Sequence, residues 1–140
     1  MLAALPLLAL PVALYNLLML TISGGFESDG AGARLAAPLF SLRTASRASW
    51  SINLADILMA GSLLILFAEL LKSASSRRVA ILNHSMAMVL FVICLVEFLL
   101  FPAFATSTFF LISLMVLLDV LAGFIATVVA GRRDADFRTD

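Results

Sequence analysis

The residue whose type and position are best suited to chemistry is Asp119, the single acid in the apolar run SLMVLLDVLAGFIATVV at residues 113–129. Ionisable side chains inside membrane-spanning helices are costly and usually mark function. An aspartate side chain is too short to reach the membrane surface from mid-span. No lysine or arginine lies at mid-span, and burial disfavours an unpaired charge. We therefore expect Asp119 to be neutral at pH 7 and hydrogen-bonded between helices.

Asp119 also heads a stripe of small residues, which repeats every four positions. Small residues at this spacing let two helix backbones approach closely, so Asp119 is expected to face another helix and not lipid. The spacing leaves open whether that helix belongs to the same chain, to a second copy or to a different protein. The other members of the stripe are Gly123, Thr127 and Gly131.

Three groups in the same chain are candidate partners for Asp119. Ser62, next to Gly61 in the second apolar segment, lies at a matching mid-depth. Asn16 lies about one turn higher in the first segment. The Leu7 carbonyl would lose its helical donor to the proline four residues later, and a neutral acid could donate to it.

Two further acids have local partners at helical spacing. Asp56 follows Asn53 by three residues. The asparagine can cap a helix there, with the carboxylate in the first turn. Glu69 precedes Lys72 by three residues, so these two can pair on one helix face. Both acids are expected to have structural roles.

His84 lies at a depth similar to that of Glu69, on the next apolar segment. The two side chains can meet if these segments are neighbours. A haem shared between two copies would need an axial ligand such as His84, but no other residue supports it. We therefore expect no cofactor and no metal.

Glu97 shares a helix face with Asn83, and we expect this face to point into the bundle. Two arrangements can satisfy Glu97. It can share a proton with Asp56 at a similar depth, or it can pair with Arg43 or Arg47 of the preceding polar loop. Anchoring of that loop is the structural interpretation, and a transport role is the alternative.

Four long apolar segments must position these residues. The 140-residue chain is 63% hydrophobic and 13% charged, with a mean hydropathy of +1.12. A soluble domain has about 25% charged residues, so the apolar surplus has to face lipid. We predict an all-α membrane protein, a single domain (1–140) with four transmembrane helices in an antiparallel bundle. The spans are expected at about 2–22, 53–71, 79–101 and 107–130, each close to the roughly 20 residues that a span needs.

The distribution of basic residues predicts the orientation. The 72–78 turn and the 131–140 tail carry three positive charges each, against three in the 23–52 loop. The positive-inside rule then places both termini in the cytoplasm, with the protein in the cell (inner or plasma) membrane. The first segment lacks a basic start and an A-x-A cleavage site, which favours an uncleaved span over a signal peptide.

The 23–52 loop would lie outside. Its first part is rich in glycine and serine and indicates turns. Its second part, PLFSLRTASRASW at residues 38–50, is interpreted either as a short amphipathic helix in the headgroup layer or as an irregular loop. Pro38 suits a first helical position, and Trp50 suits the membrane interface.

No catalytic pattern is recognisable. The sequence has no nucleophile with a nearby base, no P-loop and no Rossmann glycine motif, so we expect no enzyme. One cysteine and one histidine cannot form a compact zinc cluster within one chain, and the scattered basic residues do not indicate nucleic acid.

Three non-enzymatic functions remain. The leading hypothesis is a structural or accessory subunit, which associates with itself or with other membrane subunits through the small-residue stripe. The alternative is a small transporter or channel subunit that carries protons or ions past Asp119. A lipid-handling role, suggested by the amphipathic stretch of the outer loop, is the third.

Overall fold

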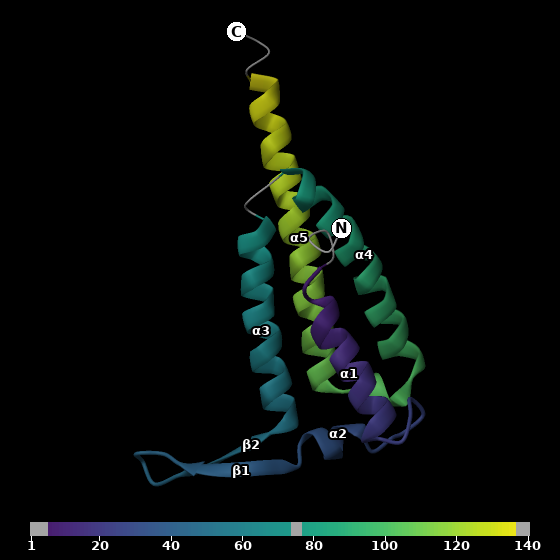
Figure 1. The fold of residues 1–140 in the computed structure, drawn as a ribbon, viewed down its shortest axis with the longest axis vertical. Helices are drawn as coiled ribbons and strands as arrows, with labels where there is room; N and C mark the ends of the chain where they lie inside the picture. Colours follow the sequence, from purple (N-terminus) through teal and green to yellow (C-terminus); the bar gives the residue numbers. More distant parts are fainter. Residues whose placement is uncertain (1–5, 74–76, 137–140) are drawn as a thin grey trace.

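The computed structural model describes residues 6–73 and 77–136, and the chain is mostly helical. The longer helices run along the long axis of the molecule, and a short helix and a hairpin lie across one end (Figure 1). We call this end the hairpin end. In chain order the elements are α1 (Ala9–Thr21), α2 (Ala31–Leu35), β1 (Pro38–Arg43), β2 (Ser49–Asn53), α3 (Leu54–Ser73), α4 (Arg77–Leu100), the 3-10 turn η2 (Pro102–Phe104) and α5 (Ser107–Asp136).

Three helices of the described chain are long and apolar enough to cross a membrane. Their apolar stretches have mean hydropathies of 2.1, 1.9 and 2.5. Many of their large side chains, such as Leu64, Leu99 and Phe124, are more than 60% exposed, as lipid-facing residues should be. These stretches are Leu54–Lys72, Asn83–Leu100 and Ser107–Ala126.

Helix α1 is shorter than the span expected at 2–22. It has 13 residues, which makes it about 20 Å long, against about 30 Å of hydrocarbon. A turn precedes it, in which the Ala9 amide donates to the Pro6 carbonyl at 3.0 Å. Pro11 lies in the first turn of α1, where its missing N–H costs no hydrogen bond. Residues 1–5, the start of the expected span, lie outside the described residues.

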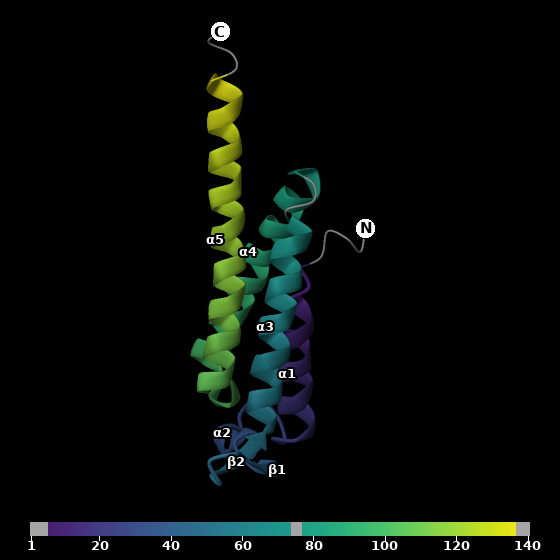
Figure 2. The same cartoon turned by 90° about the vertical axis from the view of Figure 1, so that its left-hand side faces the viewer.

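Helix α5 makes its most extensive contacts with α4 and α3. In Figure 2, α5 stands along one side of the molecule, and it extends past the ends of the other helices. Its core-facing side is formed by Phe109, Ile112, Val116 and Asp119, which are all fully buried. These positions are three or four residues apart, the spacing of one helix face.

Aromatic side chains fill the core at the hairpin end. The ring of Tyr15 packs against Phe104 and Phe109, with centroid distances of 5.5 and 4.7 Å. The Tyr15 hydroxyl donates to the Ala103 carbonyl at 3.0 Å and lies 2.6 Å from the Thr106 hydroxyl. These contacts attach α1 to the corner between α4 and α5.

The corner between α4 and α5 has the proline and the capping threonine that usually end and begin helices. Helix α4 ends at Leu100, before Pro102, as expected from a residue that cannot donate within a helix. The Phe109 amide donates to the Thr106 hydroxyl at 3.2 Å, so Thr106 caps α5.

Neither interpretation of residues 38–50, a short amphipathic helix or an irregular loop, was correct. Residues 38–43 form β1, which pairs antiparallel with β2, with Phe40 opposite Ile52 and Leu42 opposite Trp50. Pro38 begins a strand and not a helix. Apolar residues alternate with polar ones in both segments, which is the period of a strand.

Candidate functional site

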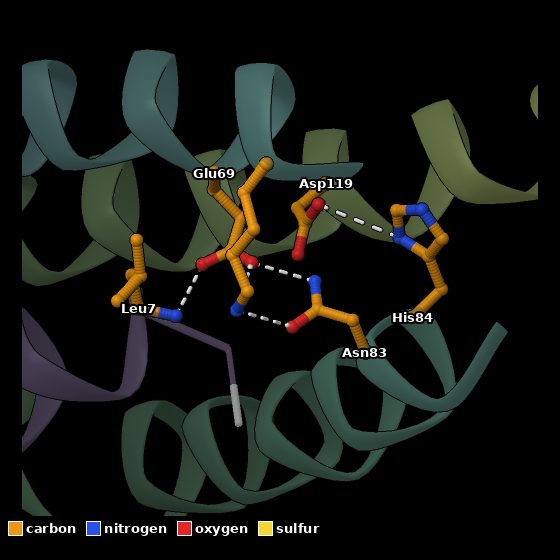
Figure 3. A network of polar contacts seen from close by, with 6 residues as sticks. Leu7, Glu69, Asn83, His84 and Asp119 are labelled. Carbon is orange, nitrogen blue, oxygen red and sulfur yellow. Dashed lines mark hydrogen bonds and ion pairs between the residues drawn. The ribbon is translucent and has the colours of Figure 1, made fainter. Parts of the chain in front are cut away.

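Four polar side chains from three helices gather in one layer of the bundle, toward the end opposite the hairpin. Figure 3 shows this cluster, with Glu69 from α3, Asn83 and His84 from α4 and Asp119 from α5 directed toward one another. Glu69, Asn83 and Asp119 are fully buried. We call these residues, with Lys72 and the Leu7 amide, the polar layer.

Glu69 is the best-satisfied member of the polar layer. Its Oε1 accepts hydrogen bonds from Asn83 Nδ2 at 2.6 Å and from Lys72 Nζ at 3.2 Å. Its Oε2 accepts from the backbone amide of Leu7 (Figure 3). Lys72 Nζ also donates to Asn83 Oδ1 at 3.0 Å, which closes a ring of three side chains.

The Glu69 carboxylate thereby binds the turn that precedes α1. The Leu7 amide belongs to the turn that leads into this helix, where amides lack a partner within the helix. A negative charge at this position also interacts favourably with the helix dipole. Glu69 therefore ties α1, α3 and α4 together at one depth.

Asp119 lies beside His84 and not beside the partners expected for it. Its Oδ1 is 3.5 Å from His84 Nδ1, and the His84 side chain is 11% exposed. Neither carboxylate oxygen of Asp119, nor His84 Nδ1, has a hydrogen-bond partner among the described residues. The pair is a carboxyl group and an imidazole that lie close together without a hydrogen bond between them.

The glycine one turn beyond Asp119 makes this arrangement possible. A β-carbon added at Gly123 would overlap Cγ, Cδ2 and Nδ1 of His84. The imidazole therefore occupies the space that a larger residue would fill. The small-residue stripe, at Asp119 and Gly123, faces α4 of its own chain.

The other two members of the stripe, Thr127 and Gly131, lie on α5, but their surroundings are outside the described part of the structure. Apart from the nearby backbone of its own helix, no described residue has an atom within 4 Å of the place where a β-carbon of Gly61 would be. This glycine is therefore not a close-packing position within the chain.

The three partners proposed for Asp119 are engaged elsewhere. The Ser62 hydroxyl donates to the Leu58 carbonyl at 2.6 Å. The Leu7 carbonyl accepts from the Leu10 amide at 3.0 Å. Asn16 Nδ2 donates to the Val12 carbonyl at 3.1 Å and to Glu97 Oε2 at 3.3 Å.

Glu97 thus has a different partner from either of those expected. Glu97 accepts a hydrogen bond from Asn16 of α1. Asp56 instead accepts one from the Asn53 amide, and Arg43 lies at the end of β1 in the hairpin. The contact of Glu69 with His84, which was possible if the two segments are neighbours, is replaced among the described residues by a hydrogen bond to Glu69 from the adjacent Asn83.

Two local pairs were predicted correctly. The Asp56 amide donates to Asn53 Oδ1 at 2.9 Å, and the Asn53 amide donates to Asp56 Oδ2 at 3.1 Å. This reciprocal pair is a capping box at the start of α3. The Glu69–Lys72 pair, at 3.2 Å, is also present.

Three contacts of the site were not anticipated from the sequence. They are the Lys72–Asn83 bond, the Leu7 amide on Glu69 and the Asp119–His84 approach. Each joins residues of different elements, so no local spacing indicates it. The available signal was the similar depth of Glu69, Asn83 and His84 on two helices with a short connection.

The chemistry open to this layer is proton exchange or electrostatic anchoring. Among the described residues, no three histidine, cysteine or acidic side chains are grouped as metal ligands. Cys94 is a free and buried thiol.

Three apolar helices of membrane-spanning length, joined by short connections, make the chain a small multi-pass membrane protein. Comparison with models of known families, with curated proteins and with solved structures gives no significant match.

Proposed function

We propose that this protein is a structural or accessory subunit of a membrane assembly. The observation that carries the proposal is the polar layer, in which Glu69, Asn83 and Lys72 bond one another and the start of α1. A layer of this kind fixes the register of the helices. The side chains of the polar layer point into the bundle. The outer surface of the long helices, which is mostly apolar, is then available to partners.

The core between the polar layer and the hairpin end favours this role over conduction. On the buried face of α5, Ile112 and Val116 separate Asp119 from the hairpin end, and both are fully buried. Leu58 and Leu66 occupy equivalent positions on α3. The buried polar side chains at these depths, Ser62 and Ser113, each donate to a carbonyl of their own helix. An ion path would need polar groups that are free to bind the ion, or water, at these depths.

The proposed topology has four passes, with α1 as the first and both termini cytoplasmic. Its support is the antiparallel course of the helices and the basic residues of the 72–78 turn and the tail. Cysteine accessibility tests it in a Cys94→Ser background. A cysteine at position 140 should react with a membrane-impermeant reagent only after cells are opened, and one at position 45 should react in intact cells. The reverse pattern would overturn the orientation.

Association tests the accessory role. Gentle purification from native membranes, followed by mass spectrometry, should recover this chain with a second copy or with other integral membrane proteins in fixed ratio. Substitution of lipid-facing Leu64 by tryptophan should weaken that association if α3 forms the contact. Recovery of a lone monomer, with no cross-linked species in native membranes, would rule the role out.

A proton- or ion-translocating role is the second candidate, and one observation favours it. Asp119 is fully buried, and neither of its carboxylate oxygens has a hydrogen-bond partner among the described residues. Reconstituted vesicles with a pH-sensitive dye inside distinguish the two functions. A proton leak that Asp119→Asn abolishes would support translocation, and the accessory role predicts equal, background leak for both proteins.

A further inference from the structure

The hairpin of β1 and β2 is amphipathic across its two faces. Residues that pair directly across an antiparallel ladder project on the same side of the sheet. The pairs Phe40–Ile52 and Leu42–Trp50 therefore form one apolar face. The pairs Ser41–Ser51 and Arg43–Ser49 form a polar face.

The described residues leave about half of this apolar face uncovered. Phe40, Leu42 and Trp50 are 51%, 49% and 56% exposed. An isolated two-stranded hairpin is marginally stable in water, and three large apolar side chains side by side favour a surface that takes them out of water.

The position of the hairpin indicates what that surface is. Strand β2 ends at Asn53, and the membrane-spanning stretch of α3 begins at the next residue. Figure 1 shows the hairpin leaving this end of α3 sideways, across the direction of the helices. A bilayer that surrounds this stretch of α3 would therefore place the hairpin where the hydrocarbon core ends, parallel to the membrane surface.

Charge completes the match to a lipid surface. Arg43 ends β1, and Arg47 lies in the turn at the tip, where the Arg47 amide donates to the Thr44 carbonyl at 2.9 Å. Both arginines are exposed. Arginines beside an apolar face suit lipid phosphates above acyl chains, and tryptophan is enriched at this interface.

We propose that the hairpin is a lipid-binding element, which inserts the face of Phe40, Leu42, Trp50 and Ile52 into the headgroup layer and places its arginines on anionic lipid phosphates. The insertion is shallow, because each strand has an unpaired edge, whose amides and carbonyls cannot enter hydrocarbon. This inference does not depend on the accessory role, since any multi-pass function would leave the hairpin at the same surface.

Trp50 reports on the hairpin alone, because it is the single tryptophan of the chain. The full-length protein is reconstituted in phosphatidylcholine vesicles, with and without phosphatidylglycerol, and Trp50 fluorescence is measured. Bromine atoms near the headgroup end of the acyl chains should quench Trp50 more strongly than bromine atoms near the chain ends. Iodide in the water should quench it weakly.

Matched variants separate the two faces and the charges. Leu42→Ser should reduce bromine quenching and increase iodide quenching, whereas Ser41→Ala, one residue away on the polar face, should change neither. The pair Arg43→Gln and Arg47→Gly should lower the preference for phosphatidylglycerol, by roughly fivefold per arginine in the ratio of inserted to detached hairpin. Arg34→Gln, on α2, should leave it unchanged.

The Arg47→Gly substitution also guards against simple unfolding of the turn. Arg47 has a φ of 64°, a conformation that glycine adopts at lower cost, so the change removes charge while it favours the turn. Strong iodide quenching without bromine quenching would overturn the proposal. If Trp50 is protected from both quenchers, and this protection is lost as the protein is diluted in lipid, the apolar face binds a second copy of the chain. That result would also overturn the proposal.

Discussion

The imidazole of His84 lies directly against the backbone of Gly123, one helical turn beyond Asp119 on α5. This contact sets how closely α4 and α5 approach at the polar layer, and it holds Nδ1 of the imidazole 3.5 Å from Asp119 Oδ1. A residue with a side chain at position 123 would require either helix to move. The close approach of Asp119 and His84 therefore depends on Gly123, a residue without a side chain of its own.

Gly123→Ala should destabilise the protein. The added methyl group overlaps the imidazole of His84, and overpacking of a filled site typically costs about 1–3 kcal/mol. Unfolding in mixed detergent micelles, followed by circular dichroism, measures the change in the free energy of unfolding.

Gly61→Ala is the matched control for this substitution. Among the described residues, no atom beyond the nearby backbone of α3 lies within 4 Å of the added methyl group. The gain in helix propensity, up to about 1 kcal/mol, should therefore dominate. The double change of Gly123→Ala with His84→Ala should recover stability relative to Gly123→Ala alone. Equal behaviour of the two glycine variants would contradict the close approach of His84.

Glu69→Gln should lower stability more than Glu97→Gln. Glu69 is fully buried and accepts from Asn83, Lys72 and the Leu7 amide. A neutral amide is a weaker acceptor, and it brings two donors into a ring that already has enough of them. Buried donors left unpaired cost about 1–3 kcal/mol.

Glu97 provides the comparison for this prediction. It is half-buried and accepts one bond from Asn16 Nδ2, at 3.3 Å, which a glutamine oxygen can also accept. The loss in the free energy of unfolding should stay below about 1 kcal/mol. If both glutamines cost the same in detergent-micelle unfolding, the polar layer does not join the helices in the way argued above.

Local spacing predicted the structure well wherever the partners are close in sequence. Hydropathy located the three long helices, and spacings of three residues predicted the Asn53–Asp56 and Glu69–Lys72 pairs. Such pairs depend only on the geometry of one helix, which is the same in every protein.

Contacts between helices could not be predicted in this way. Asp119 was expected opposite Ser62, but it lies in the layer of Glu69, seven residues further along α3 and thus about 10 Å deeper. Axial register and rotation of a helix depend on the packing of all its neighbours. The sequence of one helix does not contain that information.

The hairpin was missed for another reason. Arg43 and Arg47 are four residues apart, a spacing compatible with a helix, and the sequence was interpreted only as a helix or an irregular loop. The alternation of Phe40 and Leu42 with polar residues, repeated around Trp50 and Ile52, was the better signal, because it extends over both strands.

The charge state of Asp119 stays a prediction, and infrared spectroscopy tests it. A carboxylate with no hydrogen-bond donor is strongly disfavoured inside a protein, and neither oxygen of Asp119 has one among the described residues. We expect the band of a neutral carboxylic acid at pH 7, which Asp119→Asn removes. Loss of a carboxylate band in that variant, with no loss of an acid band, would show an ionised Asp119 paired with a charged His84.

Asn53→Ala should weaken the start of α3. The substitution removes the Oδ1 that accepts from the Asp56 amide at 2.9 Å, and loss of such a cap typically costs about 1 kcal/mol. Because β2 leads directly into α3, the first-turn amides should also exchange with solvent faster, as hydrogen exchange with mass spectrometry can measure. Asn53→Ser restores a capping oxygen and should keep both stability and protection close to those of the natural protein. Similar losses for alanine and serine would mean that residue 53 acts through its place in the hairpin and not through the cap.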